Sequence, residues 1–224
     1  MLIDIHTHTF PTSDDSTLTP EVLIDRSKAL GLDGICLTDH DRFWHPDDIF
    51  ELSRKHDYLI IPGCEVTTEE GHMLVYGLRE YIFGMHRASF VKDLVVEEGG
   101  AMVIAHPYRR VYRKSSNSGS KAYRDMLDRA ARNEALKLVD GIEVFNGRGT
   151  ADENEFASDL SRDIGLPGTG ASDAHKIEDI GTYATEFIAD ISNLEEFISE
   201  IKAGRIRGVP VPESNSTRQN MELK

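Results

Sequence analysis

Residues 2–8 read LIDIHTH, a short apolar run that carries the motif Asp4-x-His6-x-His8. Side chains two positions apart on a β-strand project from the same face, so this spacing predicts one wall with a carboxylate and two imidazoles. Two such imidazoles can bind one cation. We therefore expect a strand at residues 2–5 with a metal site at its carboxyl end.

Similar apolar runs recur along the chain and alternate with amphipathic stretches. This pattern is typical of βα units and a mostly parallel sheet. Because the carboxyl ends of barrel strands meet on one face, residues that follow different strands converge on one site. We expect further strands at residues 34–37, 58–61, 72–77, 101–105, 141–144, 168–171 and 182–188, and helices at residues 19–31, 46–56, 87–98, 121–138, 151–164 and 193–203.

Histidines are concentrated at these strand ends. Of the nine histidines, six lie at predicted strand ends, whereas His45, His56 and His86 do not and are interpreted as surface residues. His72 could instead be a buried histidine bonded to a backbone carbonyl, and Asp39 is more simply a turn cap than a ligand. The candidate site residues beside the strands are His6, His8, His40, Glu65, His72, His106, Asp173 and His175.

Length and composition favour one intracellular domain. The chain has 224 residues, 39% of them hydrophobic, which suits a single core. We expect one domain at residues 1–208 and a flexible tail at residues 209–224. No run approaches the roughly 18 apolar residues of a membrane span, and no leader is recognisable, so the prediction is a cytoplasmic protein with no membrane partner. Cys36 and Cys64 lie in apolar runs and are expected to be buried, inert thiols.

The charge distribution bears on the substrate. A formal net charge of -14 opposes binding to duplex nucleic acid. Residues 106–124 nevertheless contain six cations and no acid, which indicates an anion site. Arg109 is the best candidate to bind a phosphate, and Arg148 is a second. Residues 113–120 are expected to form a mobile loop or to close over a ligand, and Phe43 and Trp44 either stack on a substrate ring or pack within their loop.

Together these motifs resemble the PHP (polymerase and histidinol phosphatase) family. The motifs are Asp-x-His-x-His, Thr38-Asp39-His40, Pro62-Gly63-Cys64-Glu65, Ala105-His106-Pro107 and Ser172-Asp173-Ala174-His175. The resemblance implies an α/β fold, a distorted (β/α)7 TIM-like barrel with a metal site at the C-terminal ends of the strands. It also implies two or three divalent metal ions, for which manganese, iron or zinc are suitable.

The resemblance further implies a role for each matching residue. His6, His8 and Asp173 would hold one metal, and Glu65 would bridge it to a second metal bound by His72 and His106. A third metal would take His40, His175 and Asp14, with Asp15 as the alternative to Asp14. Glu143 is expected to support the site. The residues expected to act in catalysis are His6, His8, Glu65, His106, Asp173 and His175.

The predicted function is hydrolysis of a small phosphomonoester or nucleotide-type phosphate ester through a metal-bridging hydroxide. The partner would be a small anionic substrate, and a short nucleotide or RNA end is also conceivable. Only 41 positions separate Glu65 from His106 (106 minus 65), too few for the helical insertion of relatives that act on nucleoside bisphosphates or RNA ends. The alternatives are an amidohydrolase or lactonase, and a PHP domain without catalysis.

Overall fold

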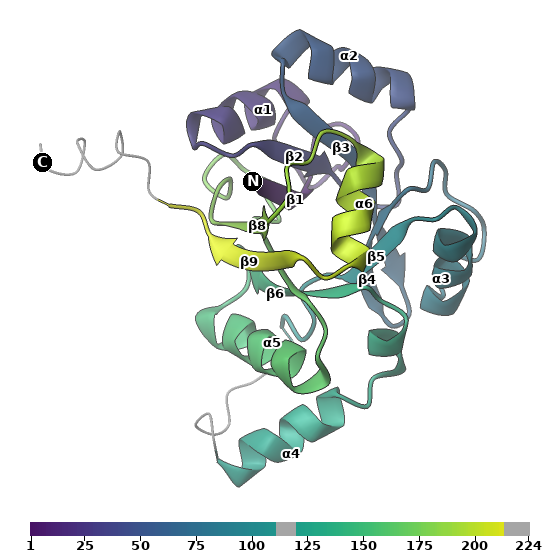
Figure 1. Ribbon diagram of the computed structural model, residues 1–224, viewed down its shortest axis with the longest axis vertical. Coiled ribbons are helices and arrows are strands. Elements are labelled where there is room, and N and C mark those ends of the chain that lie inside the picture. Colours follow the sequence, from purple (N-terminus) through teal and green to yellow (C-terminus); the bar gives the residue numbers. More distant parts are fainter. Residues whose placement is uncertain (111–119, 213–224) are drawn as a thin grey trace, which may run out of the picture.

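The computed structural model describes residues 1–110 and 120–212 (Figure 1). The predicted loop at 113–120 lies outside these ranges except for its last residue, and the predicted tail lies outside them from residue 213 on. The strands are β1 (Leu2–Thr7), β2 (Gly34–Leu37), β3 (Leu59–Thr68), β4 (Gly71–Tyr76), β5 (Ala101–Ile104), β6 (Gly141–Asn146), β7 (Gly168–Ala171), β8 (Tyr183–Phe187) and β9 (Ile206–Pro210). The helices are α1 (Pro20–Ala29), α2 (Pro46–His56), α3 (Ala88–Glu97), α4 (Lys121–Ala130), the short 3₁₀ helix η1 (Glu134–Lys137), α5 (Ala151–Ile164) and α6 (Leu194–Lys202).

The strands form one curved sheet in the order β7-β6-β5-β4-β3-β2-β1-β8-β9. Neighbours are parallel within β1-β2-β3 and within β5-β6-β7. β4 is antiparallel to β3 and β5, and β8 is antiparallel to β1 and β9. The helices α1 to α5 lie around this nearly closed barrel, and α6 crosses the strands in the view of Figure 1. The predicted distorted α/β barrel is confirmed, but the prediction of a mostly parallel sheet is wrong.

β4 runs antiparallel to β3 because the connection between the two strands is short. Only Glu69 and Glu70 separate β3 from β4, whereas a parallel crossover needs about a dozen residues or more. β4 must therefore run back beside β3, which places its first residues at the mouth of the barrel where β3 ends. This is why His72 begins its strand while the other candidate ligands lie toward the ends of theirs or after them.

Two hydrogen bonds close the barrel wall at the mouth. The backbone N–H of Asp173 donates to the carbonyl of His6 at 2.9 Å, and that of His8 donates to the carbonyl of Ala174 at 3.1 Å. These bonds join the end of β1 to the segment after β7, although β1 and β7 are not neighbours in the strand order. Residues from the beginning and the end of the chain are thereby brought to the same edge of the mouth.

Below the mouth, β9 and β7 approach each other without forming a ladder. A Cβ atom on Gly208 would lie 2.6 Å from the carbonyl oxygen of Thr169, so the close approach requires glycine. The hydroxyl of Thr185 on β8 accepts a hydrogen bond from the N–H of Gly170 at 3.1 Å and donates to its carbonyl at 2.8 Å. A side chain therefore satisfies backbone groups of β7 that a neighbouring strand would otherwise bind.

Local sequence signals explain where most helices begin. Pro20 lies at the start of α1 after the N-cap Thr19, and Thr150 and Glu153 form a capping box at α5. The helix predicted at 121–138 is shorter than expected. It ends at Ala130, and the 3₁₀ helix η1 follows after Asn133, whose side chain caps it by accepting from the N–H of Ala135 at 3.1 Å.

Buried apolar side chains fill the space between helices and strands. Phe197 of α6 packs edge-on against Tyr76 of β4, with ring centroids 4.8 Å apart. Cys36 and Cys64 are free and buried, as predicted. Burial raises the pKa of both thiols, which disfavours the reactive thiolate.

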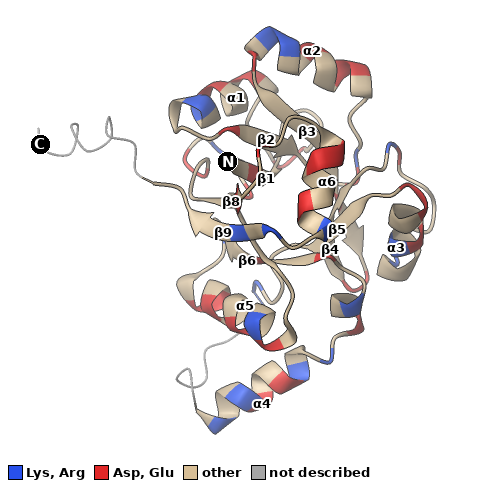
Figure 2. Cartoon of the chain, in the orientation of Figure 1, with Lys and Arg blue, Asp and Glu red and all other residues tan. Residues whose placement is uncertain are grey.

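Acidic side chains are distributed over several helices, including α2, α5 and α6, and are not collected on one of them (Figure 2). The surplus of negative charge is therefore spread over the outer helices. Within residues 1–110 and 120–212, no helix has the length and apolar content needed to span a membrane.

Candidate metal centre at the mouth of the barrel

Glu65, near the end of β3, lies at the centre of the mouth with its side chain 1% exposed. Both oxygens of its carboxylate are surrounded by imidazole nitrogens at distances of 2.7 to 3.2 Å. The rings come from β1 and from the segments that begin or follow other strands, as the barrel arrangement predicted. They belong to His6, His8, His40, His72 and His106.

Asp173, which follows β7, supplies a second buried carboxylate. Its Oδ1 lies 3.3 Å from Nε2 of His8 and 3.6 Å from Nε2 of His6, and its Oδ2 lies 4.0 Å from Nε2 of His106. Asp173 has a positive φ of 53° and His106 one of 27°, a backbone region that non-glycine residues rarely adopt and that is common at functional sites.

The donor atoms of this cluster fit a metal ion. Nε2 of His6, Nε2 of His8 and Oε2 of Glu65 are buried and have no hydrogen-bond partner, which is costly unless something else satisfies them. Atoms bound to one cation at about 2.1 Å lie roughly 3.0 to 3.5 Å from one another, close to the separation of 3.2 Å between Glu65 Oε2 and each ring nitrogen. Mixed imidazole and carboxylate donors suit Mn²⁺, Fe²⁺ and Zn²⁺.

The carboxylates and imidazoles shift one another's pKa. Burial alone would lower the pKa of His6, but the carboxylates of Glu65 and Asp173 raise it well above its usual value. Burial alone would raise the pKa of Glu65 and Asp173, but the facing imidazoles hold both well below their usual range. Both acids are therefore charged at neutral pH and provide the negative charge that a cation site needs.

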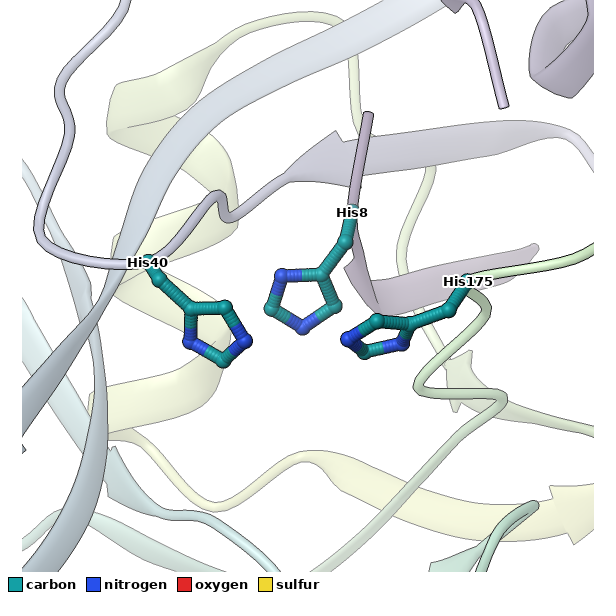
Figure 3. A group of neighbouring side chains, drawn as sticks. All are labelled: His8, His40 and His175. Atoms are coloured by element: carbon teal, nitrogen blue, oxygen red, sulfur yellow. The ribbon is translucent and has the colours of Figure 1, made fainter. Parts of the chain in front are cut away.

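A further group of rings lies beside this cluster. Figure 3 shows the rings of His8, His40 and His175 converging, and each offers a nitrogen within 4.8 Å of the others. Oδ2 of Asp15 lies 3.0 Å from Nε2 of His175 and 3.5 Å from Nε2 of His40. The sequence favoured Asp14 over its neighbour at this position, but these contacts favour Asp15.

Two polar residues of β6, Glu143 and Asn146, form hydrogen bonds with residues of the cluster. Oε1 of Glu143 lies 3.0 Å from Nδ1 of His6, and Oε2 accepts from the backbone N–H of His106 at 2.7 Å. Nδ2 of Asn146 donates to Glu143 at 3.0 Å and to Oδ2 of Asp173 at 3.2 Å. These contacts agree with the supporting role expected of Glu143. Asn146 was not identified from the sequence, although it lies between Glu143 and Arg148 in the same motif.

Both predicted phosphate-binding arginines reach the cluster. Nη1 of Arg109 forms a short ion pair with Oδ2 of Asp173 and donates to Oδ1 of Asn146 at 3.2 Å. Nη1 of Arg148 lies 3.0 Å from Nδ1 of His175 and 3.9 Å from Oδ1 of Asp173. A cavity of about 370 Å³ adjoins the cluster, lined in part by Arg109, by the neighbouring Arg110 and by two of the histidines, His72 and His106.

Asp39 and the aromatic residues Phe43 and Trp44, whose roles the sequence left open, lie outside the cluster. Asp39 binds backbone and side-chain donors of the loop after β1, as expected of a turn cap. Nε1 of Trp44 donates to Asp39 at 2.7 Å, and Phe43 packs against the buried core, so each aromatic side chain has a partner within the protein. His56 is not the surface residue that was expected, because its side chain is 12% exposed and lies 3.5 Å from Asp25.

Several known proteins are similar to this chain in sequence or in fold. An uncharacterized protein of Methanocaldococcus jannaschii is 25% identical over 159 residues, which cover 65% of this chain and 82% of that protein. A two-domain protein of Bacteroides vulgatus, described as containing a predicted PHP-like metal-dependent phosphoesterase, matches with a TM-score of 0.66 and 20% identity over 94% of this chain and 65% of that one. An amidohydrolase of Chromobacterium violaceum with bound sulfate and no metal matches with a TM-score of 0.56 and 20% identity over 96% of this chain and 99% of that one.

The family follows from the sequence match. The pattern of the PHP domain matches residues 4–152, more than half of the 224 residues, and a pattern described as PHP-associated matches residues 151–206. The first match includes Glu65 and the rings around it, and the second includes Asp173 and His175. The resemblance seen in the motifs is therefore confirmed, and the chain belongs to the PHP domain family.

Proposed function

We propose that this chain is a metal-dependent phosphoesterase that hydrolyses a small phosphomonoester or a nucleotide-type phosphate ester. The observation that carries the proposal is the carboxylate of Glu65, buried among five imidazole rings with one oxygen and two facing ring nitrogens lacking hydrogen-bond partners. In the proposed assignment, Glu65 would contribute ligands to two ions. His6, His8 and Asp173 would hold one of them, His72 and His106 would hold the other, and His40, His175 and Asp15 would hold a third.

Bound divalent cations would lower the pKa of a coordinated water toward neutrality and offset the charge that gathers on a phosphoryl group. The residues of the chain prepare the site for this chemistry. Glu143 accepts from Nδ1 of His6, so that Nε2 of the same ring would be the nitrogen that binds a cation. Arg109 and Arg148 bring guanidinium groups to the same place, where they would bind phosphate oxygens and hold the substrate.

The cavity beside the cluster supports a small substrate. Its volume of about 370 Å³ lies at the lower end of the range of roughly 300 to 1,000 Å³ for small-molecule sites. The formal net charge of -14 disfavours long polyanions, so we propose a small anionic substrate in the cytoplasm, with a short nucleotide or RNA end as the largest partner.

The test is a hydrolysis assay of the protein loaded with Mn²⁺, Fe²⁺ or Zn²⁺. The panel would contain phosphomonoesters, phosphodiesters, nucleotides and short RNAs, together with an amide and a lactone. We expect metal-dependent release of phosphate from at least one monoester or nucleotide and its loss in His106→Ala, whereas His86→Ala, a change outside the cluster, keeps the activity. Hydrolysis of only the amide or lactone would overturn the proposal in favour of an amidohydrolase, and a loaded protein without any hydrolysis would favour a domain without catalysis.

A further inference from the structure

Asp39, two residues after β2, has a buried carboxylate that accepts four hydrogen bonds. Oδ1 accepts from the N–H of Thr9 at 2.6 Å and from the hydroxyl of Ser13 at 2.7 Å. Oδ2 accepts from the hydroxyl of Thr9 at 2.9 Å and from Nε1 of Trp44 at 2.7 Å. Its side chain thus binds the loop after β1 and the indole of Trp44, and it is absent from the groups of described residues that could hold an ion.

Ser13 connects Asp39 to two histidines of the proposed metal centre, to the ring of His8 and to the backbone of His40. Its hydroxyl accepts from the backbone N–H of His40 at 3.1 Å and lies 3.4 Å from Nδ1 of His8. A hydroxyl has one hydrogen to donate and two lone pairs to accept with. Because a carboxylate can only accept, the single hydrogen of Ser13 goes to Asp39, and the contact with His8 requires the ring to donate.

This arrangement selects one tautomer of His8. With its hydrogen on Nδ1, the ring keeps a lone pair on Nε2. That nitrogen lies 3.2 Å from Oε2 of Glu65 and 3.3 Å from Oδ1 of Asp173 and has no hydrogen-bond partner. The form of His8 that Ser13 favours is therefore the form that can bind a cation at this position.

The same loop places Asp15. The hydroxyl of Ser16 donates to the carbonyl of His8 at 2.9 Å and contacts the carbonyl of His175 at 3.3 Å. The carboxylate of Asp15, between these two anchored serines, faces His40 and His175. The hydrogen bonds to Asp39 thus anchor the loop after β1 before Asp15, and those of Ser16 anchor it after Asp15.

We propose that Asp39 and Ser13 are positioning residues, which fix the tautomer of His8 and anchor the backbone of His40 and the loop that carries Asp15. The inference rests on the proposed metal centre. It adds that the proposed ligands are already oriented by hydrogen bonds before a cation binds. Supporting residues of this kind typically change metal affinity about 10- to 100-fold when they are removed.

The first experiment compares Ser13→Ala with Ser13→Thr, which keeps the hydroxyl. Nitrogen-15 NMR of the metal-free proteins would report the tautomer of His8, and calorimetric titration with Mn²⁺ would report affinity and stoichiometry. We expect hydrogen on Nδ1 of His8 in the wild type and in Ser13→Thr. In Ser13→Ala we expect a shift toward the Nε2–H form and Mn²⁺ binding weakened about 10- to 100-fold.

The second experiment separates positioning from stability. Asp39→Asn removes the charge of the carboxylate and one of its two acceptor oxygens, whereas Trp44→Phe removes only the indole bond to the same carboxylate. We expect Asp39→Asn to weaken Mn²⁺ binding as Ser13→Ala does, and Trp44→Phe to lower the Tm while binding Mn²⁺ as the wild type does. Circular dichroism would verify that each variant is folded, and Ser13→Ala decides the question if Asp39→Asn does not fold.

The outcomes distinguish this inference from the proposed function. If Ser13→Ala has the wild-type tautomer and affinity, the positioning role is overturned while the metal centre stands. If the wild type binds no Mn²⁺, Fe²⁺ or Zn²⁺, the proposed function is overturned together with the effect on affinity. The NMR measurement on the metal-free protein then still tests whether Ser13 sets the tautomer.

Discussion

Arg148 contacts the ring of His175 in a way that a bound cation would change. Its Nη1 lies 3.0 Å from Nδ1 and 3.1 Å from Nε2 of that ring. A guanidinium carries only donors, so it cannot share the lone pair of Nε2 with a cation. Occupation of the site by metal would displace the guanidinium of Arg148 from that nitrogen and leave it available to a phosphate.

Replacing Arg148 with alanine should therefore weaken substrate use more than metal binding. Hydrogen bonds to a charged group contribute about 1.5 to 3 kcal/mol, so we expect kcat/KM for the best phosphate ester to fall roughly 10- to 100-fold. Steady-state kinetics with a Mn²⁺ titration would measure both effects. Arg162→Ala on α5, which removes an exposed guanidinium, is the matched control, and equal kinetics in Arg148→Ala and wild type would contradict the assignment.

Metal binding should release protons at neutral pH. The pKa of His6 is raised well above its usual value by Glu65 and Asp173 against the effect of burial, so in the metal-free protein this ring carries a proton at pH 7. A cation must displace that proton, and affinity should increase as pH rises toward the pKa of His6. Calorimetry in buffers of different ionisation enthalpy would count the released protons, and an affinity independent of pH between 6 and 8 would contradict the expectation.

The sequence identified most of the side chains that lie together at the mouth, because their types are rare in strands and their spacing is regular. His6, His8 and Glu65 were predicted together and lie together. The choice between Asp14 and Asp15 depended on the path of an irregular loop, which spacing alone does not determine. Asn146 was missed because the predicted strand ended at residue 144 and an asparagine just after a strand is commonly a turn residue. In the structure it is the last residue of β6, and its contacts with Glu143 and Asp173 reveal its position.

At the scale of elements, the predicted helices and parallel strands correspond well to the structure. The directions of β4 and β8, which are antiparallel to their neighbours, do not. α2 and α5 have the predicted bounds. β4 follows a two-residue connection that was interpreted as part of a βα series. β9 was missed because Ile206–Pro210 is short and contains glycine and proline, residues that weaken a strand pattern. Its pairing with β8 comes from the tertiary structure.

The capping box of α5 offers a test at this scale. The hydroxyl of Thr150 accepts from the N–H of Glu153 at 3.3 Å, and the Glu153 carboxylate accepts from the N–H of Thr150 at 2.8 Å. Thr150→Ala should lower the free energy of unfolding by about 0.5 to 2 kcal/mol, measured by urea denaturation. Thr150→Ser retains the hydroxyl and should remain within a few tenths of a kcal/mol of the wild type. Equal destabilisation by both variants would show that the hydroxyl does not cap the helix.

At the scale of the whole molecule, the proposed metal centre combines residues from both halves of the chain. His6 and Glu65 come from the first three strands, and His106 and Asp173 come after β5 and β7. Without a cation, His6 and Glu65 leave buried polar atoms unpartnered. A cation that binds only the folded chain must then stabilise the whole barrel.

Addition of Mn²⁺ should therefore raise the Tm, and a chelator should reverse the effect. At a free concentration about 100 times the Kd, the gain is about 2.7 kcal/mol for one site. Differential scanning calorimetry would measure it, and Glu65→Gln, which removes the bridging charge, should abolish most of the increase. Glu69→Gln in the adjacent turn is the matched control. A wild-type Tm that does not respond to metal would contradict the proposed centre.

The two hydrogen bonds between β1 and the segment after β7 lie beside this centre. The amide of Asp173 is bonded to His6, and both residues also supply proposed ligands, although 167 positions separate them (173 minus 6). Deuterium uptake at the amides of His8 and Asp173 would therefore depend on how fully the site is loaded. Dissociation of the ions and breaking of these two hydrogen bonds would then be one cooperative event, in which the ligands of β1 separate from those that follow β7.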